Sequence, residues 1–237
     1  QTHCPTPAAD VAEHMVGMNL DFITEDFEKI LISMKTGAER IRQLVLSLRN
    51  FARLDESDMK FVDIHEGIEN TLTMLQHQLN GEANRAKIEI IKEYSHLPVV
   101  ECYPGQLNQV ILYLLSNAID ALEDGIGDQI TPANGEWIAP TIRICTQVLD
   151  QHQVEIRIAD NGRGIPESLQ QRLFDPFFTT KSVGRGTGLG LSISYQIVVK
   201  RHRGQLSCVS TLGAGAEFII KIPILQSSSA SVLTLSN

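Results

Sequence analysis

Three segments of the chain carry residues whose types and spacing could bind a charged ligand. The first is a predicted helix, LNQVILYLLSNAIDAL (107–122), which carries Asn117. The second is DNGRGIP (160–166), and the third is KSVGRGTGLGLSIS (181–194), where glycines lead into a predicted helix. Glycines let a backbone approach phosphates closely, and the N-terminus of a helix attracts anions. A glycine-rich stretch alone is more often only a turn, so the combination of the three carries the argument.

Together these segments resemble the ATP-binding domain of sensor histidine kinases, within a superfamily that includes gyrase, the mismatch-repair ATPases and a heat-shock chaperone. SNAIDA is similar to that family's N box, DNGRGIP to its first glycine box, FDPFFTTK (174–181) to its F box, and GRGTGLGLS to its second glycine box. The upstream MKTGAERIRQLVLSLRNFARLDE (34–56) resembles the second helix of the kinase dimerization domain. The resemblance therefore extends over most of the chain.

The resemblance implies ATP and Mg²⁺ as cofactors and assigns roles to single residues. Asp160 would accept a hydrogen bond from the exocyclic amine of adenine, and Gly162 and Gly164 would leave room for the base. Asn117 would place its side-chain oxygen on Mg²⁺, a hard cation that takes oxygen ligands. The phosphates would be held by backbone N–H groups, a hydroxyl and two cations of a lid; these residues are Lys181, Arg185, Gly186, Thr187, Gly188, Leu189 and Gly190.

Each of these residues also has a purely structural interpretation. Asp160 alone would be an Asx-turn cap before Asn161 and Gly162. Asn117 alone would be a polar residue on a helix surface, and the two cations would be solvated charges. Three phenylalanines of the F box are expected both to anchor the lid and to join the core; they are Phe174, Phe177 and Phe178.

Two positions depart from the family pattern. Hydrolases of the superfamily carry a water-activating Glu one helical turn before the metal-binding Asn, where this chain has Tyr113. This favours a kinase over a hydrolase but leaves the Mg²⁺ shell open, because many kinases have another polar residue there. In the third glycine box, Ala216 stands where Thr is usual, so one hydrogen bond on the adenine side is expected to be missing or mediated by water.

The seven histidines do not provide the expected phosphoacceptor. In the family this histidine precedes an acidic residue on the first dimerization helix. Only His65 is followed by an acid, Glu66, but it lies in the first turn of a helix predicted from Asp63 to about Leu79. The acceptor helix is therefore expected upstream of Gln1, in a longer protein.

Apolar residues recur at alternating spacings of four and three between positions 27 and 52, which predicts a helix packed in a bundle. They are Phe27, Leu31, Met34, Ala38, Ile41, Val45, Leu48 and Ala52. We expect this seam to form a homodimer, although it could instead lie on the domain's own core. The expected organisation is a linker and partial dimerization domain (1–56), an ATP-binding domain (61–224) and a flexible tail (225–237).

Strand-like segments alternate with helical ones through the second of these regions. Strands are predicted at 87–94, 98–102, 141–150, 152–160, 204–211 and 216–224, and helices at 63–79, 104–123 and 191–201. This order indicates an α+β fold, a two-layer sandwich in which helices cover one face of a mixed sheet.

Composition excludes several other classes of protein. A formal net charge of −8 argues against a general binder of nucleic acids or acidic membranes. No apolar run approaches the ~18 residues of a membrane span. The four cysteines are far apart, which favours free thiols in a reducing compartment, and we expect a cytoplasmic location.

Three functions remain from the sequence. The first is the catalytic core of a sensor histidine kinase, which transfers the ATP γ-phosphoryl group to a histidine for relay to the aspartate of a receiver domain. The second is an ATP hydrolase, which Tyr113 disfavours. The third is a non-catalytic module that binds a receiver partner under the control of nucleotide.

Overall fold

The computed structural model describes residues 26–27, 29–31, 33–34, 58–80, 86–127, 139–150, 152–181 and 186–226, without the side chains of 124–127. Contacts divide the chain into two compact units, 1–49 with 181–185, and 50–180 with 186–237. In the first unit the described residues between 26 and 34 are helical, as their spacing predicts. The rest of the predicted 27–52 helix lies outside the described residues, as does the tail beyond Gln226.

The second unit contains a five-stranded mixed sheet. Its strands follow the order β2 (Glu89–Tyr94), β4 (Thr141–Leu149), β5 (Gln153–Asp160), β7 (Ala216–Pro223) and β6 (Gln205–Ser210). β2 is parallel to β4, and every other neighbouring pair is antiparallel. β1 (Lys60–Val62) and β3 (Val100–Cys102) form a separate antiparallel pair.

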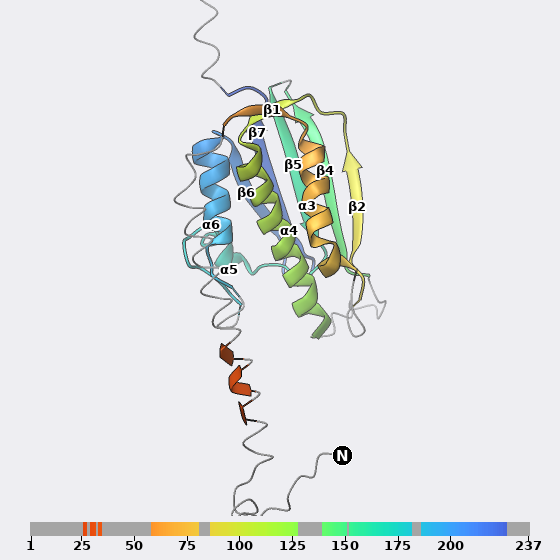
Figure 1. The fold of residues 1–237 in the computed structure, drawn as a ribbon, viewed down its shortest axis with the longest axis vertical. Coiled ribbons are helices and arrows are strands. Elements are labelled where there is room, and N and C mark those ends of the chain that lie inside the picture. Colours follow the sequence, from red (N-terminus) through yellow and green to blue (C-terminus); the bar gives the residue numbers. More distant parts are fainter. Residues whose placement is uncertain are drawn as a thin grey trace, which may run out of the picture. The chain divides into compact units, whose positions relative to one another are not determined.

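Three long helical segments lie side by side over one face of this sheet (Figure 1). They are α3 (Ile64–Leu79), α4 (Pro104–Gly127) and α6 (Gly190–Tyr195), which η1 (Gln196–Arg201) continues as a π-helix; α5 (Glu167–Gln170) is a single turn. The predicted α+β fold, with a mixed sheet covered by helices, is confirmed. No helix of the described residues is long and apolar enough to cross a membrane.

The alternation of side chains explains why the strands bury one face. In β7, Ala216, Phe218, Ile220 and Ile222 are buried, and the residues between them are only half-buried. A strand places successive side chains on opposite faces, so this pattern turns one apolar row toward the helices. The predicted start of α3 is confirmed, because Asp63 Oδ1 accepts a hydrogen bond from the His65 N–H at 2.8 Å.

Some elements differ from the sequence prediction. α4 continues to Gly127 instead of ending near Glu123, and the predicted helix 191–201 changes to π geometry at Gln196. β1 was not predicted, because three residues are too short to show an alternating pattern. Its pairing with β3 is a tertiary contact, in which Phe61 lies opposite Glu101.

A buried histidine ties the end of η1 to the start of α4. His202 has no exposed surface, and its Nε2 accepts a hydrogen bond from the Tyr103 N–H at 3.0 Å. Its Nδ1 lies 2.8 Å from the Ile197 carbonyl oxygen, so the neutral tautomer with the proton on Nδ1 satisfies both contacts. Burial lowers the pKa of this imidazole, which keeps it neutral.

We therefore predict that His202→Leu lowers the free energy of unfolding by about 1–3 kcal/mol, because it leaves the Tyr103 N–H without a partner, whereas the Ile197 carbonyl keeps the backbone N–H of residue 202. The pKa of His202 is lower in the folded protein than in the unfolded chain. Its contribution should thus be complete above about pH 6.5 and decline as the pH falls. Urea denaturation at several pH values measures both effects. His96→Leu, at an exposed histidine, is the control. An equal loss of unfolding free energy in both variants would contradict a stabilising role for the hydrogen bonds of His202.

Candidate functional site

One face of α4 brings the two glycine segments to the same place. Tyr113, Asn117 and Ala121 follow one another at intervals of one turn, so they share a face of the helix. A Cβ added to Gly162 would lie 3.0 Å from the backbone oxygen of Ala121, and one added to Gly190 would lie 3.4 Å from the Tyr113 ring. Asn117, which is half-buried, therefore lies on α4 between the contacts to the first and second glycine segments.

Asp160 ends β5 beside the first glycine segment. Its Oδ1 accepts a hydrogen bond from the Gly162 N–H at 2.9 Å, and the backbone of Ala216, its partner in β7, also bonds to the carboxyl. Burial raises the pKa of this carboxyl to about 6, and the two backbone hydrogen bonds oppose that shift. The backbone of Ala216 thus still forms a hydrogen bond to the Asp160 carboxyl, although the Thr side chain expected at this position is missing.

The hairpin between β6 and β7 supports the first glycine segment. The Gly213 N–H donates to the Arg163 carbonyl at 2.7 Å, and the Ile165 N–H donates to Ser210 Oγ at 2.8 Å. Gly164 has a φ of +70°, and a Cβ there would collide with the Thr211 carbonyl oxygen. Only glycine combines this backbone conformation with so close an approach.

The second glycine segment packs against the predicted F box. Gly188 has a φ of +66°, and its Cα faces the backbone of Phe177, itself at a φ of +65°. The Phe174 ring lies 5.4 Å from the Tyr195 ring, and the Arg172 guanidinium lies 4.8 Å from the Phe178 ring. Phe174 and Phe178 are thus half-buried, whereas Phe177 is 72% exposed.

The structure brings together only part of the predicted site. Asn117, Asp160, Gly162, Gly164 and the backbone of 186–190 all belong to the second unit. Within 186–190, the Leu189 N–H donates to Thr187 Oγ1 at 3.4 Å. Lys181 belongs to the first unit, and Arg185 lies outside the described residues.

The contacts of Arg163, Gln170 and Tyr113 were not predicted from the sequence. Gln170 Nε2 donates to the carbonyls of Ile165 and Ser210, and Arg163 Nη2 lies 3.4 Å from Thr180 Oγ1. For Arg163, the only signal in the sequence was the presence of a cation within the first glycine segment, DNGRG. Nothing in the spacing of residues could have indicated that the Tyr113 ring meets Gly190.

The described residues contain no cluster of three or more His, Cys, Asp or Glu side chains that could hold a metal ion. The predicted metal contact Asn117 would contribute an amide oxygen, which is not among these side-chain types. His65 has a structural setting instead. Its Nε2 lies 2.8 Å from Thr146 Oγ1, and its ring stacks on Tyr94 with 4.5 Å between centroids.

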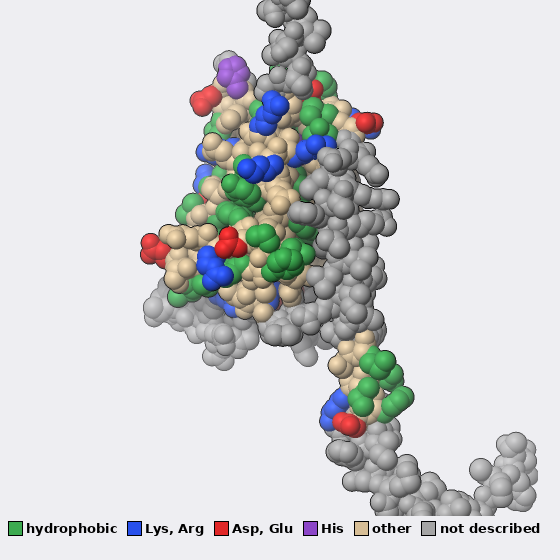
Figure 2. Space-filling view, turned by 90° about the vertical axis from the view of Figure 1, so that its left-hand side faces the viewer, with side chains coloured by type: hydrophobic (Ala, Val, Ile, Leu, Met, Phe, Trp, Pro, Cys, Tyr) green, Lys and Arg blue, Asp and Glu red, His purple; other side chains and the backbone are tan. Residues whose placement is uncertain are grey.

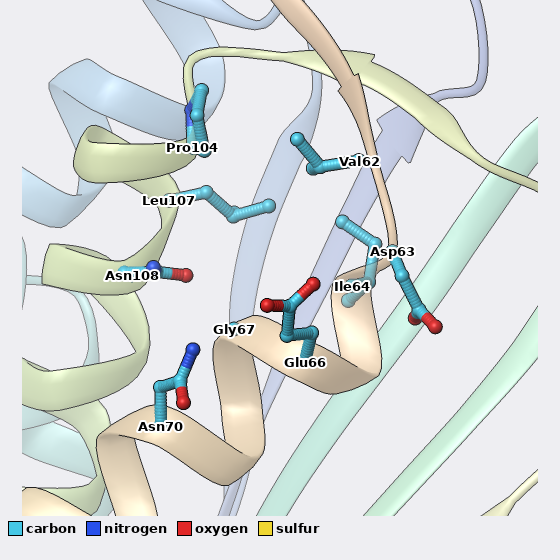
Figure 3. A pocket seen from close by; sticks show the side chains of 9 residues that line it. All are labelled: Val62, Asp63, Ile64, Glu66, Gly67, Asn70, Pro104, Leu107 and Asn108. Carbon is cyan, nitrogen blue, oxygen red and sulfur yellow. The ribbon is translucent and has the colours of Figure 1, made fainter.

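Other surface features lie apart from this site. A hollow of about 190 Å³ lies between the first turns of α3 and α4, and Glu66, Asn70 and Asn108 line it (Figure 3). None of its lining residues belongs to the predicted site. On the face seen in Figure 2, Lys and Arg side chains gather in the upper part. The α6–η1 helix carries two cationic side chains, Lys200 and Arg201. Both lie in its last turn, at the opposite end from Gly190 and therefore away from the predicted site.

The raised pKa of Asp160 predicts that this carboxylate destabilises the fold at neutral pH. Asp160→Asn should raise the free energy of unfolding at pH 7–8 by about 1–3 kcal/mol, at 1.36 kcal/mol for each pKa unit. The folded protein binds this proton more tightly than the unfolded chain, so the advantage of the variant should grow as the pH rises from 4 through 6. Denaturation curves of both proteins test this. The exposed Asp175→Asn should show no such pH-dependent gain, and an equal gain there would argue against burial as the cause.

The chain is similar in sequence to several curated proteins. The chain is 36% identical over 149 residues to sporulation kinase E of Bacillus subtilis, an alignment that covers 62% of the chain and 18% of that protein. It is 34% identical over 209 residues to the two-component sensor PprA of Pseudomonas aeruginosa, which covers 88% of the chain and 21% of the sensor. With the histidine kinase AtoS of Escherichia coli it is 34% identical over 187 residues, 78% of the chain and 27% of AtoS. The chain thus spans about a fifth to a quarter of the length of these curated relatives.

Solved structures share the fold. The catalytic domain of the histidine kinase ThkA is 27% identical, with a TM-score of 0.54, and the match covers 70% of this chain and 96% of that domain. Full-length ShkA in complex with AMPPNP is 23% identical, with a TM-score of 0.66 over 84% of this chain and 39% of ShkA. Residues 102–226, which contain Asn117, Asp160 and both glycine segments, match the family model described as histidine kinase-, DNA gyrase B-, and HSP90-like ATPase. The chain belongs to this family of ATPases.

Proposed function

We propose that the chain is the ATP-binding catalytic core of a two-component sensor histidine kinase, which transfers the γ-phosphoryl group of ATP to a histidine outside this sequence. One observation carries the proposal. A single face of α4 holds Asn117 between the glycine segment that follows Asp160 and the one that begins α6. The relatives named as sensor kinases support the same function.

The residues fit an adenine nucleotide. The Asp160 carboxylate would accept the exocyclic amine N–H of adenine, an N–H that guanine lacks at that position. Gly162 keeps the first segment close to Ala121, and Gly164 keeps it close to the β6–β7 hairpin. A base bound there would lie against backbone, where any larger side chain would displace it.

Asn117 and the second glycine segment would hold the metal and the phosphates. The side-chain oxygen of Asn117 fits Mg²⁺, which supplies charge neutralisation when bound. The backbone N–H groups of 186–190, at the start of α6, would donate to phosphate oxygens, and the Thr187 hydroxyl would assist. We also propose Lys181 and Arg185 as lid cations that neutralise phosphate charge. Phosphoryl transfer needs mainly such positioning and charge stabilisation.

We also propose an organisation of the chain into three parts. Residues 1–56 would be a linker and part of the dimerization domain, 61–224 the ATP-binding domain, and 225–237 a tail. The seam between 27 and 52 would form the homodimer. The phosphohistidine of the first dimerization helix would then serve a receiver domain as phosphoryl donor.

We predict that Asp160→Ala weakens the binding of ADP by about 1.5–3 kcal/mol, the scale of a hydrogen bond to a charged group. Binding to the unchanged protein should weaken as the pH falls below about 6, because protonation removes the carboxylate acceptor. Calorimetry with ADP at several pH values measures both effects, and the same titration with GDP measures the preference for adenine. Glu89→Ala, on the edge strand β2, is the matched control. Unchanged ADP affinity in Asp160→Ala, or equal affinity for GDP, would refute the adenine assignment.

We further predict that this chain binds ATP without phosphorylating itself. Transfer requires an imidazole in line with the γ-phosphate, and the ring of His65 is held by Thr146 and Tyr94. Incubation with radiolabelled ATP should therefore leave no acid-labile phosphate on the chain. The same sequence joined to a preceding helix that carries a histidine followed by an acidic residue should become labelled. Labelling of any of the seven histidines in the isolated chain would contradict the prediction.

A further inference from the structure

Tyr113 lies on α4 one turn before Asn117. Its side chain is half-buried and packs against the hydrophobic core. The ring carbons Cδ1 and Cγ both lie 3.4 Å from the position of a Cβ on Gly190. The ring therefore supports the first residue of α6 directly.

The hydroxyl group of Tyr113 has a different partner. It accepts a hydrogen bond from Gln109 Nε2 at 3.0 Å. Gln109 lies one turn before Tyr113, whereas Asn117 lies one turn after it, so this bond points the hydroxyl toward the start of α4. The hydroxyl group is thus engaged on the side of Tyr113 away from Asn117.

The position of Gly190 matters because it fixes the backbone around it. The Ile193 N–H donates to the Leu189 carbonyl at 2.9 Å, and Ser192 Oγ donates to the same carbonyl at 2.9 Å. Ser194 Oγ donates to the Gly190 carbonyl at 2.8 Å. These bonds make the start of α6 a stiff unit, so a shift of Gly190 would move the end of the glycine segment with it.

We propose that Tyr113 is a positioning residue whose ring fixes the second glycine segment relative to Asn117, and that its hydroxyl group is not a metal contact. This inference rests on the proposed nucleotide site. The ring sets the spacing between the amide that would hold the metal and the N–H groups that would hold the phosphates. Such groups stabilise a phosphoryl group only when they are already in place.

The proposal separates the ring from the hydroxyl group, so two substitutions test it. Tyr113→Leu removes the ring, and Tyr113→Phe removes only the hydroxyl group. Gln109→Leu is the matched control, because it removes the partner of the hydroxyl while the ring stays. ADP affinity is measured by calorimetry with Mg²⁺ and with EDTA, and hydrogen exchange of the 186–190 amides is measured without nucleotide.

We expect Tyr113→Leu to weaken ADP binding about tenfold, to a similar degree with Mg²⁺ and with EDTA, since a displaced cradle acts on the phosphates themselves. Exchange at 186–190 should become faster even without nucleotide. Tyr113→Phe, which keeps the ring, should retain the ADP affinity and the slow exchange of the unchanged protein. Gln109→Leu should also leave both properties near those of the unchanged protein. Circular dichroism and the unfolding midpoint confirm that each variant is folded; if Tyr113→Leu is not, Tyr113→Met replaces it as the variant without a ring, with the same expected results.

Three results would overturn the proposal. The first is a loss of affinity in Tyr113→Phe that appears only with Mg²⁺, which would make the hydroxyl group a metal contact. The second is unchanged affinity and exchange in the variant without the ring. The third is faster exchange throughout the unit and not only at 186–190, which would indicate a general packing role. Failure of the nucleotide site itself is distinguishable, because the unchanged protein would then bind no ADP.

Discussion

The close approach of α4 to two glycine-containing turns is the constraint on which the site depends. α4 is anchored by a row of buried apolar residues that includes Ile111, Leu114, Leu115, Ala118, Ile119 and Leu122. Its other face touches Gly162 through Ala121 and Gly190 through Tyr113. A side chain at Gly162 would push that turn away from the helix, and one larger than a methyl group at Gly190 would meet the Tyr113 ring. The core therefore determines the dimensions of the site, because the helix that fills the core also forms one wall of the site.

Two unfavourable local features, a buried carboxyl and a left-handed backbone conformation, lie at the site, although Arg203 beside His202 also has a positive φ. Asp160 is a carboxyl whose pKa burial raises to about 6, and Phe177 adopts a φ of +65° that is uncommon for residues other than glycine. By contrast, both ring nitrogens of the buried His202 have backbone partners. Strained or destabilised groups persist where the surrounding structure holds them in place and function requires them. Asp160 fits this description, since its carboxylate is useful only when a ligand donates to it.

The sequence allowed prediction of the elements with a clear period and of the residues with a fixed local role. The alternation in β7 and the capping residue Asp63 are local signals, so the strand and the start of α3 could be placed in advance. β1 could not, because its pairing with β3 depends on residues forty positions away. The π-helical segment that begins at Gln196 was equally hidden; at its end the His202 N–H donates to the Ile197 carbonyl, five residues earlier. For the site, the motifs indicated which residues gather, but only the fold shows that the ring of Tyr113, and not its hydroxyl group, faces the glycine segment.

The residue at position 113 also affects where a phosphoryl group could go. Hydrolysis requires a base within hydrogen-bond reach of the attacking water, and this position presents a ring to Gly190 and a hydroxyl group to Gln109. Transfer to His65 would require breaking both its hydrogen bond to Thr146 and its stacking on Tyr94. In the proposed kinase, a site with no base at position 113 and with His65 held by these contacts would hold a nucleotide without consuming it. In the proposed kinase, transfer would begin only when an imidazole from another part of the protein approaches the nucleotide, so control over that approach would be control over the reaction.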